Sequence, residues 1–257
     1  MITIGVSGAL GRMGKEVVKA VCNSDEFKLI CAVDVYDIDT NVCKDVRIHG
    51  DLKAAIEIAK PDVMIDFTQP KFVYENAKTC IEMGVRPVIG TTGLSDIQIQ
   101  TLKELSEKNG IGCLIAPNFS TGAVLMMMFA KQAAKYFNNA EIIEMHHNQK
   151  KDAPSGTAIK TAQMMAEENS SFTKENCEET EIIEGSRGGK SYSDIHIHSV
   201  RMPGFMASQE VIFGSSGQTL KIRHDSVDRQ CYMSGVLLAA KYVAQHNEFV
   251  YGLENIL

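Results

Sequence analysis

The first part of the chain alternates between short β-branched runs and longer segments with apolar residues at helical spacing. Residues 1–7 form an apolar run that ends at glycine, and residues 12–22 place apolar side chains along one helix face. The alternation continues, with strands predicted at 28–33, 62–67, 86–89 and 111–116 and helices at 51–59, 72–83 and 95–108. Strands separated by single helices need crossover connections. We therefore predict a Rossmann-like, doubly wound parallel sheet covered on both faces.

The pattern changes after residue 117. Helices are predicted at 121–137 and 157–168, and strands at 141–145, 180–184, 194–200, 210–213 and 219–224. Consecutive strands joined by short turns favour a second, α+β domain with a mixed sheet. A last helix, at 230–245, is free to pack back on the first domain. We predict an α/β chain of two domains, one formed by 1–117 and 227–257 and the other by 118–226.

Composition and charge exclude several classes of function. The 257 residues are 44% hydrophobic and carry a formal net charge of −6, which argues against a nucleic-acid partner. No stretch reaches the roughly 18 to 20 apolar residues of a membrane helix, and no export signal is recognisable, so we expect no membrane partner and a cytoplasmic location. Seven cysteines, odd in number and widely spaced, predict reduced thiols, no disulfide and no metal site.

The turn after the first strand is rich in glycine. Gly8, Gly11 and Gly14 stand between a strand and a helix, where backbone without a Cβ can approach a pyrophosphate and the helix N-terminus attracts anions. The spacing departs from the stricter G-x-G-x-x-G pattern, and such turns also occur in purely structural roles. We predict a dinucleotide site here, which makes 1–117 and 227–257 the dinucleotide-binding domain.

Asp34 ends the second strand, about twenty residues beyond the glycine turn, where a carboxylate can accept hydrogen bonds from an adenosine ribose. A carboxylate would repel a 2′-phosphate, and the following Val35 and Tyr36 provide no arginine to offset that repulsion. We therefore predict that NADH is favoured over NADPH. Three basic residues could weaken the preference and keep NADPH open as a cofactor: Arg12, Lys44 and Arg47.

Two further loops follow strands of the predicted sheet, at the edge where ligands of open α/β sheets bind. We predict cofactor contacts from Gly90, Thr91 and Thr92 in one loop and from Ala116, Pro117, Asn118 and Phe119 in the other. Ordinary turn and helix-cap chemistry is the alternative interpretation of both loops.

The segment 141–158, EIIEMHHNQKKDAPSGTA, carries the densest candidate chemistry. His146 leaves the end of a strand and Lys150 follows within one loop; they can provide the titrating base and the proton that reduction of an unsaturated ring requires. The helix that follows opens with groups suited to hold a carboxylate: Ser155, Gly156 and Thr157. We predict an anionic substrate. The alternative is a polar loop with an N-capping serine, surface lysines and histidines bonded to backbone.

The run His146-His147-x-x-Lys150-x-Asp152-x-Pro154-Ser155-Gly156-Thr157 resembles the signature of the 4-hydroxy-tetrahydrodipicolinate reductase family, formerly called dihydrodipicolinate reductase. Four companions resemble family features in family order: the turn from Gly8 to Gly14, Asp66-Phe67-Thr68, the loop from Gly90 to Gly93, and Asn118-Phe119-Ser120. The resemblance therefore covers the whole chain.

The resemblance implies an NADH- or NADPH-dependent oxidoreductase of lysine and diaminopimelate biosynthesis. It would reduce 4-hydroxy-tetrahydrodipicolinate, through dihydrodipicolinate, to tetrahydrodipicolinate. His146 is then the general acid/base and Lys150 the proton donor. The carboxylates of this small dicarboxylate substrate are bound by His147, Lys150, Ser155, Gly156 and Thr157. The cofactor is bound by Gly8, Ala9, Leu10, Gly11, Arg12, Met13, Asp34, Gly90, Thr91, Thr92, Ala116, Pro117, Asn118 and Phe119. The resemblance also implies a homotetramer, with 118–226 as the substrate-binding and oligomerisation domain.

One position departs from the family pattern, and two other functions stay open. Many family members have histidine where this chain has Ser208, which argues against a role for that loop beyond structure. A related two-domain amino-acid dehydrogenase would share the plan but lack the HHxxKxDxPSGT run. A non-catalytic nucleotide-sensing protein would keep the glycines but lose His146 or Lys150, and both are present.

Overall fold

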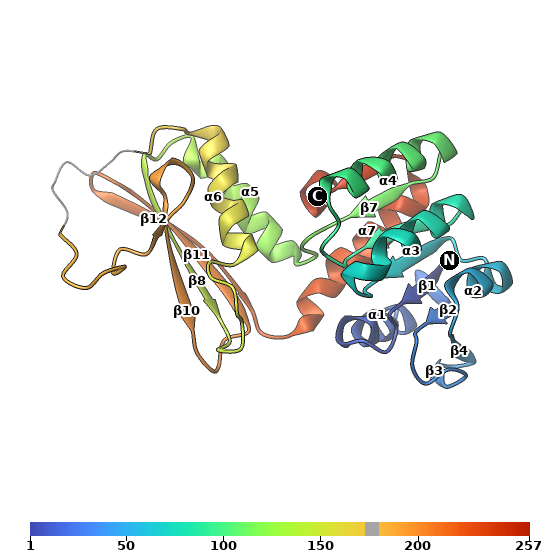
Figure 1. Ribbon diagram of the computed structural model, residues 1–257. Helices are drawn as coiled ribbons and strands as arrows, with labels where there is room; N and C mark the ends of the chain where they lie inside the picture. The colour runs from blue at the N-terminus through green and yellow to red at the C-terminus, as the bar shows by residue number, and fades with distance from the viewer. Residues whose placement is uncertain (173–179) are drawn as a thin grey trace. The chain divides into compact units, whose positions relative to one another are not determined.

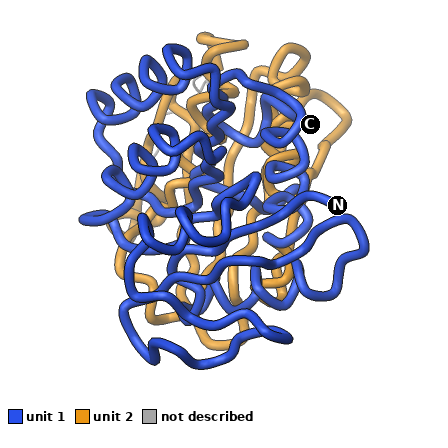
Figure 2. Tube along the Cα trace, turned by 90° about the vertical axis from the view of Figure 1, so that its right-hand side faces the viewer, with its two compact units in different colours: residues 1–121, 232–257 blue, residues 122–231 orange. Residues whose placement is uncertain are grey.

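Two units, each with its own sheet, make up the part of the chain that a computed structural model describes, residues 1–172 and 180–257. The first unit comprises Met1–Thr121 and Tyr232–Leu257, and the second comprises Gly122–Cys231 (Figure 2). The boundaries predicted from the sequence lie at 117/118 and 226/227, a few residues before these divisions. Cys177 lies outside the described residues.

The first unit is built on an eight-stranded sheet with the order β13-β7-β6-β5-β1-β2-β4-β3. Its strands are β1 (Ile2–Ser7), β2 (Phe27–Val33), β3 (Asn41–Cys43), β4 (Val46–His49), β5 (Val63–Asp66), β6 (Arg86–Ile89), β7 (Cys113–Ile115) and β13 (Phe249–Tyr251). The central pairings are parallel, and β3 runs antiparallel to β4 at the edge. The strand order reverses at β1, so the ends of β1, β2 and β5 form the edge at which such sheets bind ligands.

Helices cover both faces of this sheet (Figure 1). They are α1 (Arg12–Cys22), α2 (Leu52–Ala59), α3 (Pro70–Glu82), α4 (Asp96–Asn109) and α7 (Met233–Gln245). On one face, α2, α3 and α4 bury apolar side chains such as Ile56, Ala77 and Leu102 against the strands. The helices α1 and α7 pack on each other and on the strands, with Val17 and Val236 fully buried. The predicted doubly wound parallel sheet is confirmed.

The second unit has a five-stranded sheet in the order β12-β11-β8-β10-β9. Its elements are α5 (Thr121–Ala134), β8 (Asn139–His146), α6 (Gly156–Glu168), β9 (Gly189–Lys190), β10 (His196–Arg201), β11 (Ala207–Ser215) and β12 (Gln218–Ser226). Because β8 pairs parallel with β10 and antiparallel with β11, the sheet is mixed, as predicted. Both α5 and α6 lie along one face, where Ala130, Ile142, Met165 and Phe213 form a core (Figure 1).

The strand predicted at 180–184 is wrong, because this stretch forms a bend and turn. The carboxylate of Glu181 accepts the backbone N–H of Gly185 at 2.7 Å and of Arg187 at 3.0 Å, and these bonds close the turn. A side chain that satisfies nearby backbone groups competes with strand pairing. The short strands β3, β4, β9 and β13 were not predicted. They lie at or next to the edges of the two sheets and are less buried than the similarly short β5, β6 and β7.

The prediction of no disulfide is also wrong, since Cys22 and Cys43 are joined. Cys22 ends α1 and Cys43 ends β3, and the fold brings their Cα atoms to 6.7 Å. Linear spacing could not show this pairing because it depends on the packing of the unpredicted β3 beside α1. Among the other described cysteines, Cys31, Cys80 and Cys113 are buried free thiols.

Candidate active site

Backbone atoms of the turn after β1 come too close to tolerate side chains. Gly8 has φ +78°, and a Cβ there would lie 2.5 Å from the carbonyl oxygen of Phe67. A Cβ on Gly14, in the first turn of α1, would lie 1.9 Å from the carbonyl oxygen of Gly8. Gly11 caps α1, and within the described residues no side chain caps this end and no acidic residue occupies its first turn. Its first N–H groups therefore suit an anion such as a pyrophosphate.

Asp34, at the end of β2, is bonded to the glycine turn. Its Oδ2 accepts the N–H of Leu10 at 2.9 Å, and its Oδ1 accepts those of Val35 at 2.8 Å and Tyr36 at 3.3 Å. A carboxylate oxygen can accept about two hydrogen bonds, so Oδ2 retains capacity for a ribose hydroxyl. Asp34 therefore helps to shape the glycine turn, a role that its position in the sequence did not reveal. The ribose contact stays a prediction.

A pocket of about 370 Å³ lies beside Asp34 and the glycine turn. It is lined by Ser7, Gly8, Leu10, Gly11, Val33, Asp34, Val35, Tyr36, Gly50, Leu52, Phe67, Thr68, Gln69, Phe72 and Asn76. Four predicted cofactor residues are in this lining: Gly8, Leu10, Gly11 and Asp34. Leu52, at the start of α2, and Phe72 and Asn76 of α3 also line the pocket. The sequence did not predict these lining residues, because no motif marks them. The volume lies in the range of small-ligand sites and suits part of a nucleotide.

Asp66, at the end of β5, joins three segments around the second predicted loop. Its Oδ1 accepts the N–H and hydroxyl of Thr68 at 3.0 and 2.8 Å and the hydroxyl of Thr91 at 2.8 Å. Its Oδ2 accepts the amide of Asn76, from α3, at 2.9 Å. The side chain is buried, so each of these bonds matters to the carboxylate. In the sequence, Asp66 was noted only as part of the run Asp66-Phe67-Thr68. Its position as a carboxylate at the end of an apolar strand could have indicated this role.

Three predicted cofactor residues are buried and can reach a nucleotide only through backbone atoms: Ala9, Ala116 and Phe119. Phe119 packs on Phe67, with ring centroids 5.9 Å apart. Thr91 is also buried. The other predicted cofactor residues outside the pocket lining are at least partly exposed: Arg12, Met13, Gly90, Thr92, Pro117 and Asn118. The structure thus gathers the glycine turn and Asp34 in one pocket, and the cofactor contacts of residues 116–119 stay a prediction.

The catalytic candidates lie between the end of β8 and the start of α6 in the second unit. His146 is the last residue of β8, and Ser155 is the N-cap of α6, where its Oγ accepts the N–H of Ala158 at 3.2 Å. Ser155 is therefore an N-capping serine, as the interpretation of this segment as an ordinary polar loop also predicted. Gly156 and Thr157 are the first two helical residues, and N–H groups at these positions have no acceptor within the helix. They can bind a carboxylate.

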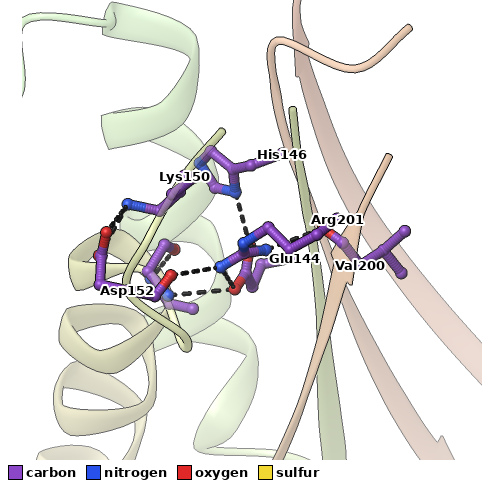
Figure 3. A network of polar contacts seen from close by, with 8 residues as sticks. Glu144, His146, Lys150, Asp152, Val200 and Arg201 are labelled. Atoms are coloured by element: carbon purple, nitrogen blue, oxygen red, sulfur yellow. Dashed lines mark hydrogen bonds and ion pairs between the residues drawn. The ribbon is translucent and has the colours of Figure 1, made fainter. Parts of the chain in front are cut away.

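Lys150 and Asp152 form an ion pair at the rim of this loop. The Nζ of Lys150 donates to both carboxylate oxygens of Asp152, at 2.8 and 2.7 Å. The hydrogen bond from Lys150 holds the pKa of Asp152 below its usual value. The backbone N–H of Lys150 donates to the carbonyl of His147 at 3.1 Å, and His147 itself is exposed. Figure 3 shows Lys150 and His146 near the end of β8.

Two residues of this cluster were missed, Glu144 and Arg201. Glu144 is fully buried and lies two residues before His146 on β8, so both side chains point to the same face of the strand. The guanidinium of Arg201 forms two parallel hydrogen bonds to Glu144, at 2.8 and 2.7 Å (Figure 3). The alternation on β8 could have identified Glu144, whereas Arg201 depends on the pairing of β10 with β8.

Ser208, the departure from the family pattern, lies in β11 and not in the loop before it. It is buried opposite Asp225 of β12, and its side chain hydrogen-bonds that carboxylate. Ser208 therefore has a structural contact within the sheet.

Neither a cluster of metal-ligating side chains nor a helix able to cross a membrane occurs in the described residues. Across residues 1–172 and 180–257, no group of three or more His, Cys, Asp or Glu is placed to hold a metal ion. No helix in that part of the chain has both the length and the apolar character needed to cross a membrane.

Comparisons with known proteins agree over the whole chain. Residues 2–119 match the family described as dihydrodipicolinate reductase, N-terminus, and residues 122–257 match its C-terminus. A 4-hydroxy-tetrahydrodipicolinate reductase from Listeria welshimeri is 52% identical, covering 99% of each chain. One from Gloeothece citriformis is 51% identical, covering 100% of this chain and 98% of its own. A solved structure of dipicolinate-bound dihydrodipicolinate reductase from Paenisporosarcina sp. TG-14 covers 100% of both chains at 48% identity, with a TM-score of 0.93.

Proposed function

The chain belongs to the dihydrodipicolinate reductase family, and we propose that it reduces 4-hydroxy-tetrahydrodipicolinate to tetrahydrodipicolinate with NADH or NADPH, in lysine and diaminopimelate biosynthesis. The observation that carries the proposal is a single loop that places His146 and Lys150 beside the open N-terminus of α6. A relative of the same fold was solved with dipicolinate, a planar ring that bears two carboxylates.

The second unit has groups of the right kind to bind the two carboxylates of this substrate. The N–H groups of Gly156 and Thr157 and the positive end of the α6 dipole favour one carboxylate. The ammonium of Lys150 and the ring of His147 suit the other. Because Lys150 is paired with Asp152, substrate binding would exchange one carboxylate partner for another. The first unit, with its glycine turn and pocket, would bind the nucleotide.

The reaction begins with loss of the 4-hydroxyl as water, which gives the conjugated cyclic imine dihydrodipicolinate. A bound reduced nicotinamide would supply the hydride that C4 accepts. Lys150 or His146 then delivers a proton to the adjacent ring carbon, where the enamine electron pair forms the new C–H bond and the imine is restored. Acid catalysis of this kind requires a donor within hydrogen-bond reach of the carbon that receives the proton.

An assay with enzymatically generated substrate tests this function. A synthase would make 4-hydroxy-tetrahydrodipicolinate from pyruvate and aspartate semialdehyde, and oxidation of NADH or NADPH would be followed by absorbance. We expect oxidation that depends on the synthase. Folded protein that binds both nucleotides yet oxidises neither would contradict the proposal and favour a non-catalytic nucleotide-sensing protein.

We propose NADH as the favoured cofactor in this reaction. The carboxylate of Asp34 stands at the pocket rim, followed by the exposed side chains of Val35 and Tyr36, so the charge near a 2′-phosphate would be negative. The same assay gives the ratio of kcat/KM for the two nucleotides. A ratio in favour of NADPH would contradict this part of the proposal.

We propose a homotetramer that associates through the sheet of the second unit. The helices α5 and α6 cover one face of that sheet, and the opposite face carries the half-buried side chains of Ile143 and Ile212 among charged residues. Light scattering coupled to size-exclusion chromatography should give a mass four times that of the 28.2 kDa chain. A monomer across micromolar concentrations would refute this assembly.

We propose the cytoplasm as the compartment, because reduced nicotinamide is regenerated there. Glutathione and thioredoxin keep most cytosolic thiols reduced, so we expect the Cys22–Cys43 bond to be open in cells and to form during purification in air. Alkylation of thiols before lysis, followed by mass spectrometry, should find both cysteines modified. Unmodified, disulfide-linked cysteines would argue for an oxidising compartment.

A further inference from the structure

Glu144 is a buried carboxylate that contacts both ends of the catalytic loop. Its Oε2 lies 2.5 Å from Nδ1 of His146, and its Oε1 accepts the N–H of Ser155 at 3.1 Å. Arg201 donates from Nη1 to Oε2 at 2.8 Å and from Nη2 to Oε1 at 2.7 Å (Figure 3). One carboxylate thus joins the predicted acid/base to the N-cap of the helix predicted to bind the substrate.

Glu144 carries a negative charge despite full burial of its side chain. Burial by itself raises the pKa of this carboxyl, but hydrogen bonds from His146, Arg201 and Ser199 outweigh it and lower the pKa to about 2. The bidentate contact with Arg201 provides the opposite charge that a buried carboxylate requires.

An ionised carboxylate only accepts hydrogen bonds, so the Nδ1 of His146 must carry the hydrogen in their contact. This leaves Nε2 as the ring nitrogen that can exchange a proton with a ligand. Arg201 donates to the same carboxylate, so the imidazole ring and the guanidinium share one acceptor. Lys150 and Asp152, which pair with each other, are further charged groups of this loop.

Arg201 also holds the loop that carries Lys150. Its Nη2 donates to the carbonyl of Asp152 at 2.7 Å, while Glu144 accepts from Ser155. The Glu144–Arg201 pair is therefore bonded to His146, to the middle of the loop and to the N-cap of α6.

We propose that Glu144 and Arg201 are positioning residues for the reduction: they set the tautomer and charge of His146 and hold the Lys150 loop against it. This inference rests on the proposed function. It predicts opposite effects of the two charges on the ionisation of His146, because a carboxylate favours the imidazolium and a guanidinium opposes it.

The test measures the ionisation of His146 in two single variants of the full chain. Ring ¹⁵N NMR would follow the titration of His146 without ligand, with the signal assigned from its loss in His146→Gln. Relative to the unmodified protein, the midpoint should move to lower pH in Glu144→Gln and to higher pH in Arg201→Gln, by roughly one pH unit in each case. The corresponding limb of the kcat/KM profile should move in the same directions, and kcat should fall at least about tenfold.

Glu141→Gln is the matched control. Glu141 lies on the same strand but on its other face, and it also contacts an arginine and a histidine, Arg187 at 2.8 Å and His198 at 2.7 Å. Its loss should leave the titration of His146 and the kcat/KM profile unchanged. An equal shift in Glu141→Gln would show that the effect is general electrostatics and would overturn the assignment.

Loss of one buried partner can prevent folding, so a double variant is included. Glu144→Gln with Arg201→Met removes both charges and leaves no unpaired ion. We expect it to fold and bind nucleotide normally but to turn over at least about tenfold more slowly. Wild-type turnover in this variant, or unshifted midpoints in both single variants, would overturn the inference. Midpoints that shift as expected in a protein without any turnover would instead refute the proposed function.

Discussion

The ammonium of Lys150 pairs with the carboxylate of Asp152, and the lysine side chain is 20% exposed. An ammonium at the rim of a loop can leave this partner for a substrate carboxylate without any change in the core. Its substitution should therefore affect chemistry more than folding.

Lys150→Ala should lower kcat by about a hundredfold or more, the scale of lost acid catalysis, while nucleotide affinity and melting temperature stay near those of the unmodified protein. Steady-state kinetics and nucleotide titration would measure both. The neighbouring Lys151 is exposed, and Lys151→Ala is the control that should retain activity. Equal losses in the two variants would indicate a general charge effect.

Asp34 has two tasks, holding Leu10 of the glycine turn and setting the charge of the pocket rim. Asp34→Asn keeps an acceptor for the turn but removes the charge that would repel a 2′-phosphate. We expect the ratio of kcat/KM for NADPH over NADH to rise roughly tenfold, equivalent to about 1.4 kcal/mol. Asp37→Asn, a change in the same exposed segment, should leave the ratio unchanged. A constant ratio in Asp34→Asn would exclude Asp34 as the discriminating residue.

At the scale of elements, α1 can start directly after the turn because Gly14 lets helix and turn approach closely. A Cβ at position 14 would meet the carbonyl oxygen and carbon of Gly8 at 1.9 and 2.8 Å, and backbone atoms cannot rotate away as a side chain does. A side chain at position 14 would therefore disturb both the N-terminus of α1 and the glycine turn that lines the pocket.

Gly14→Ala should raise the nucleotide dissociation constant at least about tenfold and lower the free energy of unfolding by roughly 1–3 kcal/mol, the cost of overpacking. Fluorescence titration and denaturant unfolding would measure these quantities. Gly214, in β11, has open space where a Cβ would lie, so Gly214→Ala is the matched control. Normal nucleotide binding by Gly14→Ala would show that the glycine turn is not part of the cofactor site.

Elements with a clear local pattern were predictable, and weakly marked ones were not. The range 12–22 for α1 and 86–89 for β6 agree with the structure, because apolar periodicity, glycines and charged flanks all mark their ends. In contrast, β3 and β4 owe their pairing to neighbours in the fold, and 180–184 became a turn because Glu181 satisfies two backbone N–H groups.

At the scale of the whole molecule, the buried charge of Glu144 links stability to pH. Its pKa is lowered from 4.5 to about 2 in the folded state, so it stabilises the fold above the unfolded value and loses that contribution as pH falls toward 2. The full contribution is on the order of 3 kcal/mol, with about half lost by about pH 3.5.

The difference in unfolding free energy between the unmodified protein and Glu144→Gln should therefore shrink as pH falls from about 6 to about 3.5. Urea unfolding at several pH values would measure it. Exposed Glu57 is the control, and Glu57→Gln should follow the unmodified protein at each pH. A difference in unfolding free energy that stays constant or grows on acidification would show that Glu144 is not ionised in the folded protein.

The sequence by itself determined the two kinds of sheet, the glycine turn and the segment from His146 to Thr157, because these are recorded in residues close together in the chain. Periodicity, glycine spacing and a loop motif are local properties. The tertiary structure decided which distant groups contact one another. Arg201 reaches Glu144 only through the pairing of β10 with β8, Asp66 meets Thr91 only where β5 and β6 end together, and Cys22 meets Cys43 across an unpredicted strand. Such contacts depend on strand register and packing, which no local pattern encodes.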